Sequence, residues 1–209
     1  MKLNQLLQQN GTFLAKLLAT LTVQALITFG VMEFCRSRNI TLGILPLILC
    51  FILLFALLAV IMLASLPIYT KFLIFTLLSI IIGATLSTNN VPDANIKRAI
   101  WGAVGIFIAM FLVGVCLTGM GVDLSVIGII LLILLVSLII GQLLMYFYPV
   151  SDTASKVWIH FGVILFGFYV IYDINIILQY RPFGDDYVAS SVNLYFDFIN
   201  IFISLLKKK

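Results

Sequence analysis

Long, uninterrupted apolar runs are the feature that most limits how this chain can fold. Seven runs each reach the roughly 18 residues that mark a candidate membrane-spanning helix. They lie at about 13–35, 42–66, 70–88, 99–119, 124–148, 157–179 and 187–206. Because lipid offers the backbone no hydrogen-bond partner, only helices and closed barrels span a bilayer, and continuous rather than alternating runs favour helices. We therefore expect an all-α integral membrane protein, a seven-transmembrane helix bundle forming one domain over residues 1–209.

The composition agrees with a location in the lipid bilayer. Hydrophobic residues make up 63% of the chain and charged residues 10%, against about 45–50% and about 25% in soluble domains. The connections between the runs are short and hold most of the polar residues. No segment is long enough for a soluble domain outside the membrane, so any chemistry should occur within the bundle or at its mouths.

The net charge of +4 does not predict nucleic-acid binding. The basic residues stand singly or in pairs at span ends, apart from Lys207–Lys209 at the C-terminus. With seven spans, eight of them fall on the C-terminal side and three or four on the N-terminal side, which predicts a cytosolic C-terminus by the positive-inside rule. If the last segment is instead a re-entrant hairpin, the C-terminus stays cytosolic and the side of the N-terminus changes.

Sequence motifs for enzymatic chemistry are missing. There is no phosphate-binding glycine loop, no HExxH and no nucleophile elbow, so a kinase or hydrolase has no support. Cys35, Cys50 and Cys116 form neither a disulfide framework nor a zinc spacing. We expect no enzyme and no cofactor.

Two aspartates interrupt the apolar runs near the C-terminus. Asp173 lies within Phe161–Leu178 and Asp197 within Tyr187–Leu206. A carboxylate at the centre of a spanning helix costs about 2.5–3.5 kcal/mol on insertion scales. Ionisable residues at such positions usually mark an ion or proton pathway, so this pair is the main functional signal in the chain.

The polar residues of the last run share one helical face. Ser190, Asn193, Asp197, Asn200 and Ser204 fall within an arc of about 80° at 100° per residue. Such a stripe must face protein or water rather than lipid. Serine and asparagine alone could serve to form hydrogen bonds between helices, but that role requires no carboxylate.

In the sixth run Tyr169, Asp173 and Tyr180 share a face, spread over about 40°. Their phenol groups could donate hydrogen bonds to the carboxylate. His160 lies about 140° from Asp173 on the same wheel, so we expect it to have a packing or interfacial role rather than to relay protons. Lys71, near the start of the third run, is expected to extend toward the headgroups.

The last two runs together resemble the transmembrane Bax inhibitor motif family. The sixth run contains the pair Tyr172-Asp173 near its end, and the seventh reads Asn-Leu-Tyr-Phe-Asp-Phe-Ile-Asn-Ile-Phe-Ile-Ser-Leu-Leu over 193–206. The two aspartates are separated by 24 residues, and Asp185-Asp186 stand directly before Tyr187. The resemblance covers about residues 160–206.

This resemblance implies a bundle with the last helix at its centre, and a calcium leak across a membrane, gated by pH through a di-aspartyl sensor. Asp173 and Asp197 would be that sensor and transient calcium ligands, supported by Tyr169, Asn193 and Asn200. Asp185 or Asp186 would be the carboxylate at the pore mouth. The resemblance further implies an ER or Golgi type of membrane in a eukaryotic or viral context and the inner membrane in a bacterium, with cell-death regulators as candidate partners.

One feature departs from the family pattern. Members with a characterised latch carry an arginine in the second span, able to pair with the sixth-span aspartate. Here 41–66 contains neither Arg nor Lys, and the first basic residue after it is Lys71. The closed state is then held differently, or the leak is less tightly gated.

Two neighbouring carboxylates in a low-dielectric site cannot both ionise cheaply, so we expect them to share a proton and titrate jointly. Calcium prefers oxygen ligands and would compete with that proton. Two other functions stay open: a proton-coupled ion transporter or exchanger, and a non-conducting membrane protein that binds partners and restrains cell death.

Overall fold

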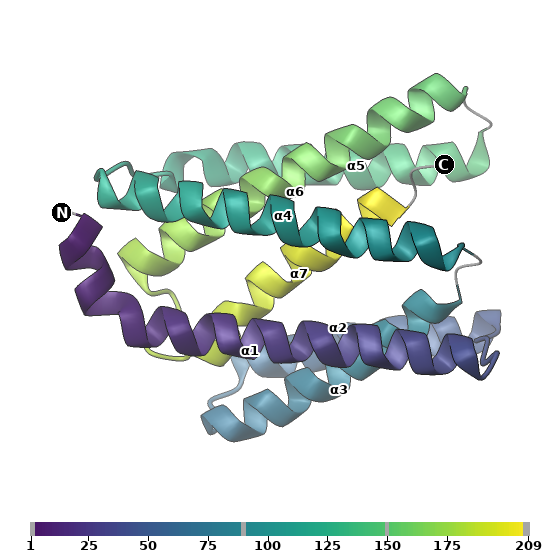
Figure 1. The fold of residues 1–209 in the computed structure, drawn as a ribbon, viewed down its shortest axis with the longest axis horizontal. Coiled ribbons are helices and arrows are strands. Elements are labelled where there is room, and N and C mark those ends of the chain that lie inside the picture. Colours follow the sequence, from purple (N-terminus) through teal and green to yellow (C-terminus); the bar gives the residue numbers. More distant parts are fainter. Residues whose placement is uncertain (1–2, 89–90, 149–150, 207–209) are drawn as a thin grey trace. The chain divides into compact units, whose positions relative to one another are not determined.

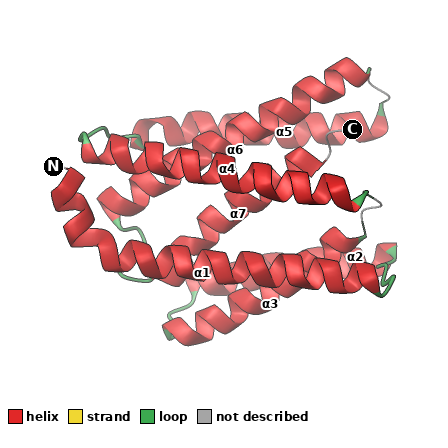
Figure 2. Ribbon diagram, in the orientation of Figure 1, coloured by secondary structure: helices red, strands yellow, loops and turns green. Residues whose placement is uncertain are grey.

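The fold is known from a computed structural model that describes residues 3–88, 91–148 and 151–206 (Figure 1). Within these ranges the regular elements are all helical, and Figure 2 shows no strand there. Their order is α1 (Leu3–Ser37), α2 (Ile44–Leu63), α3 (Ile68–Ser87), α4 (Asp93–Gly119), the short 3-10 helix η1 (Ser125–Ile127), α5 (Gly128–Phe147), α6 (Asp152–Tyr180) and α7 (Tyr187–Leu206). The basic tail Lys207–Lys209 lies outside the described residues, so its charge is known from the sequence alone.

All seven α-helices are long and apolar enough to cross a membrane. The all-α, seven-helix membrane fold predicted from the sequence is confirmed. The breaks between helices follow from local chemistry: Pro67 and Pro92 directly precede α3 and α4, where a missing N–H costs nothing. Gly121 adopts a positive φ of 81° in the turn after α4, a conformation that glycine reaches without strain.

The helices differ strongly in how much of their surface is buried. In α2 and α5, the two most apolar spans, only 6% and 11% of the residues in the most apolar stretch are buried. In α7, the least apolar span, the share is 72%. Large side chains such as Leu63, at 84% exposure, therefore form the lipid-facing surface, whereas most residues of α7 are buried.

The chain forms two compact units, which are described separately. Unit 1 comprises Met1–Gly11, Val91–Pro182 and Phe196–Lys209, and unit 2 comprises Thr12–Asn90 and Phe183–Tyr195. The long helices α1 and α7 each contribute residues to both units. The description of the chain as one domain stays a prediction.

Unit 1 is built on the close packing of α4, α5 and α6 (Figure 1). A Cβ added at Gly114 of α4 would overlap the side chain of Ile174 and lie 3.0 Å from the carbonyl oxygen of Ile171. On α5, a Cβ at Gly141 would overlap the ring of Trp158, whose indole N–H donates to the Leu138 carbonyl at 3.4 Å. Both contacts depend on a missing side chain.

Unit 2 has a polar cluster inside its apolar core. Thr28 of α1 donates to the carbonyl oxygens of Gln24 and Ser79 at 3.0 and 3.2 Å, and its hydroxyl also contacts that of Tyr195. Tyr195 is fully buried and packs edge-on against Phe75, which anchors the first half of α7 to α1 and α3.

We expect Gly114→Ala to destabilise unit 1 by about 1–3 kcal/mol, the usual cost of overpacking a filled contact. The matched control is Gly105→Ala on the same helix, where a Cβ meets nothing within 4 Å and alanine gains helix propensity. Thermal unfolding in detergent measures both variants. A Gly114→Ala protein as stable as Gly105→Ala would show that the α4–α6 contact is not tight.

Candidate functional site

Helices α6 and α7 bring the two predicted aspartates together within unit 1. Asp173 is half-buried on α6, and Asp197 is 6% exposed in the part of α7 that belongs to this unit. Their carboxylates lie close enough for the two negative charges to repel one another. The two aspartates of the sequence motifs therefore lie within electrostatic reach of one another.

Asp197 lacks the compensation that a buried carboxylate normally has. Its Oδ2 is buried and has no hydrogen-bond partner among the described residues. Its helical neighbours Phe198, Ile199 and Ile201 are buried apolar side chains, and Phe198 packs edge-on against Phe107 of α4 at 5.8 Å. A carboxylate oxygen in such surroundings is costly unless a proton or a cation binds it.

The tyrosines of α6 have different surroundings. Tyr169 is half-buried and lies within electrostatic reach of both Asp173 and Asp197. The Tyr172 hydroxyl faces Gly128 at the start of α5, where an added Cβ would overlap it. Tyr172 therefore contacts α5, while Tyr169 lies beside the carboxylate pair.

Tyr180, which the helical wheel places on the Asp173 face, binds elsewhere. Its hydroxyl donates to Asp123 Oδ2, in the connection between α4 and η1. This bond, together with one from the Ser125 N–H, holds the pKa of Asp123 below its ordinary value. Tyr180 is about two helical turns beyond Asp173, so sharing a face did not bring the two side chains together.

Asn175 is a structural residue of α6 that the sequence reasoning missed. It is fully buried and its amide makes three hydrogen bonds. Oδ1 accepts from the Leu124 N–H at 3.0 Å, and Nδ2 donates to Thr118 Oγ1 and the Val122 carbonyl, each at 2.9 Å. Asn175 therefore fixes the connection after α4 to the helix that carries Asp173. An asparagine inside an apolar run was the signal that could have identified it.

Of the two candidate mouth carboxylates, Asp186 has both oxygens engaged. Oδ2 pairs with Lys71 Nζ at 2.8 Å, and Oδ1 accepts from the backbone N–H groups of Val188 and Ala189. Asp185 is exposed. The prediction that Lys71 extends to the headgroups is wrong, because its side chain is buried against this carboxylate in unit 2.

The remaining predicted polar residues differ in burial. Ser190 and Ser204 are buried on α7, and Asn193 and Asn200 are half-buried. His160 is exposed, and its Nδ1 lies 2.7 Å from the Lys156 carbonyl one turn earlier. That position suits an interfacial role.

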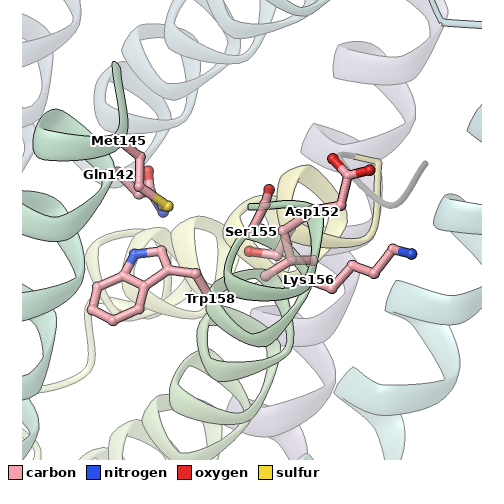
Figure 3. A pocket seen from close by; sticks show the side chains of 8 residues that line it. Gln142, Met145, Asp152, Ser155, Lys156 and Trp158 are labelled. Carbon is pink, nitrogen blue, oxygen red and sulfur yellow. The ribbon is translucent and has the colours of Figure 1, made fainter. Parts of the chain in front are cut away.

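A cavity of about 510 Å³ lies at the end of α5 and the start of α6, and Ser204 of α7 also lines it. Figure 3 shows Gln142 and Met145 on one side and Asp152, Ser155 and Lys156 on the other. Neither Asp173 nor Asp197 lines it.

The described residues contain no group of three or more His, Cys, Asp or Glu side chains that could hold a metal ion. Asp173 and Asp197 offer two carboxylates, whereas calcium takes six to eight oxygen ligands. A cation at this pair would complete its shell with water or amide oxygens, an arrangement that suits brief occupancy.

Comparisons with known proteins place the chain in a family. It matches the family described as Inhibitor of apoptosis-promoting Bax1 over residues 10–208. It is 32% identical over 87 residues to the BI1-like protein of Arabidopsis thaliana, covering 42% of this chain and 34% of the relative. It is 36% identical over 86 residues to Bax inhibitor 1 of Schizosaccharomyces pombe, covering 41% of this chain and 32% of the relative. It is 39% identical over 67 residues to protein lifeguard 4 of Mus musculus, covering 32% of this chain and 27% of the relative.

These alignments span about a third of the length of the curated relatives. The family match, in contrast, covers nearly the whole chain, and the seven apolar helices agree with it. The chain is therefore a multi-pass membrane protein that belongs to the Bax1-I family, the inhibitors of apoptosis-promoting Bax1.

Proposed function

We propose that this protein is a pH-sensitive calcium leak channel in which Asp173 and Asp197 form the sensor and a transient cation site. The observation that carries this proposal is the buried Asp197 Oδ2, which has no hydrogen-bond partner in the described chain and faces the repulsion of a second carboxylate. Such a pair is relieved by either a proton or a divalent cation.

Proton and calcium would then compete for one site. A shared proton removes the repulsion and holds α6 and α7 together, because the protonated carboxyl can donate to the ionised one. When that proton leaves, two negative charges remain in low dielectric and attract a cation. Tyr169 adds a hydroxyl within electrostatic reach of both carboxylates. The leak rate becomes pH-dependent because the proton occupies the site that calcium needs.

The ion pathway would have its entrance at the start of α7. Asp185 is exposed ahead of α7 and is the remaining candidate for a mouth carboxylate. The C-terminus would face the cytosol, in an ER or Golgi membrane or a bacterial inner membrane. The protein would act without enzymatic chemistry or a cofactor, and would restrain cell death by lowering stored calcium, with cell-death regulators as partners.

The test is calcium flux across vesicles that contain the purified protein, measured as a function of pH. Passive, pH-dependent flux supports the proposal. Calcium movement that requires an imposed proton gradient would assign the protein to proton-coupled exchangers instead. A folded protein that carries no calcium at any pH would be a non-conducting member that acts by binding partners.

Asp197→Asn should change the pH dependence of the flux more than it changes folding. Asparagine keeps the shape and hydrogen-bonding capacity of aspartate, but it neither titrates nor repels Asp173. The matched control is Asp123→Asn, which makes the same chemical change at an exposed carboxylate outside the spans. If both variants keep the parental pH profile, Asp197 is not part of the sensor.

His160→Gln should leave the midpoint of the pH response nearly unchanged. The imidazole is exposed and bonds to its own helix backbone, so its charge should couple weakly to the aspartates. The measurement is the same flux titration. A midpoint displaced by more than about one pH unit, which corresponds to ~1.4 kcal/mol of coupling, would place His160 in the sensor.

A further inference from the structure

The start of α7 is held by a partly buried ion pair in unit 2. Lys71 of α3 is 8% exposed, and its Nζ lies 2.8 Å from Asp186 Oδ2. The two residues are 115 positions apart in sequence, so the pair ties the first turn of α3 to the residue that precedes α7. Burying two charges is costly unless each is well compensated, so an ion pair at this place needs an explanation.

Asp186 also organises the first turn of α7 through its other oxygen. Oδ1 accepts from the N–H groups of Val188 and Ala189, at 3.1 and 2.9 Å. These are amides that a helix start leaves without intrahelical partners, and negative charge is favourable there. Lys16 of α1 lies over the ring of Tyr187, 5.6 Å from its centroid. The start of α7 is thus fixed to both α1 and α3.

We propose that Lys71 and Asp186 are positioning residues that hold the N-terminal turn of α7 against α3 and thereby favour the closed form of the leak. The role in closure rests on the proposed function, whereas the restraint on α7 does not. An interaction made in one form of a two-form equilibrium shifts the population toward that form. Without the pair, α7, which also carries Asp197, is freer to move.

The pair is also the contact in unit 2 that could replace the missing second-span arginine. It joins a cation of α3 to a carboxylate directly ahead of α7. A different reading treats Asp186 as a mouth carboxylate that attracts cations. The two readings predict opposite signs for one substitution. Asp186→Asn keeps a good helix N-cap but removes the charge, so it raises the leak if the pair favours closure and lowers it if the charge attracts cations.

The first experiment needs no flux. Amide hydrogen exchange of 187–190 is measured on the full-length protein in lipid nanodiscs. Lys71→Gln should speed exchange of these amides by roughly fivefold or more, the change that a loss of ~1 kcal/mol produces. Lys71→Arg, which keeps the charge, should restore the parental rate. Lys97→Gln, which removes an exposed lysine of α4, is the matched control. Parental exchange in Lys71→Gln would overturn the restraint.

The second experiment measures calcium flux in vesicles for the same variants. Lys71→Gln, Asp186→Asn and the double variant should each raise the resting leak by a similar factor of roughly five, because the pair is lost as soon as either partner is lost. Lys97→Gln should match the parent. A lower leak in Asp186→Asn, or no change in any of the three while exchange is faster, would overturn the role in closure.

The two proposals fail in different ways. A parent protein without flux overturns the calcium leak, and the exchange experiment alone then decides the restraint on α7. A second outcome is that the parent leaks calcium, that Asp197→Asn removes the pH dependence, and that substitutions at Lys71 and Asp186 leave the leak unchanged. That outcome supports the calcium leak and overturns the role of Lys71 and Asp186 in closure.

Discussion

Everything in this fold depends on the fact that a bilayer supplies no hydrogen bonds to the helices within it. Apolar helices can face lipid at no cost, and α2 and α5 accordingly have few buried residues. A helix that carries polar side chains must be shielded by protein. The polar stripe of α7 therefore explains why the least apolar span is also the most buried, the reverse of what water-soluble proteins show. Once α7 is buried, its carboxylate is buried as well, and the energetic problem of Asp197 follows from the fold itself.

The number of helices and the face of each polar residue could be predicted from the sequence, because both depend on patterns along one helix. The pairing of Asp173 with Asp197 joins two helices and was expected from the family resemblance. Apolar length gives the spans, and a helical wheel gives the face of each polar residue. Partners could not be predicted in the same way. Lys71 and Asp186 are far apart in the sequence, and neither position indicates the other. A wheel also ignores distance along the axis, which is why Tyr180 was grouped with Asp173 although it binds Asp123.

Asn175 and Asp197 show how hydrogen bonding separates structural from functional polar residues. Both lie on spanning helices and both are buried. The amide of Asn175 makes three hydrogen bonds, and removing it would leave its partners unpaired, which is the signature of a structural role. Asp197 has a carboxylate oxygen with no such partner. Selection for stability alone would not retain that oxygen, since an asparagine or a leucine would cost less.

Three aspartates of this chain differ in how well their negative charge is stabilised, and this difference indicates where a cation should bind. Asp123 is exposed and receives hydrogen bonds from Tyr180 and the Ser125 N–H, which keep its pKa low. Asp186 is neutralised by Lys71 and by the start of a helix. Both are already stabilised as anions, so neither gains much from an additional positive charge. Asp197 is the one of the three that combines burial, an unpaired oxygen and a neighbouring carboxylate. A proton or a calcium ion lowers the free energy most where the anion is least compensated. Chemistry in this chain should therefore concentrate at Asp197, while Asp186 and Lys71 act on it indirectly, by restraining the start of the helix that carries it.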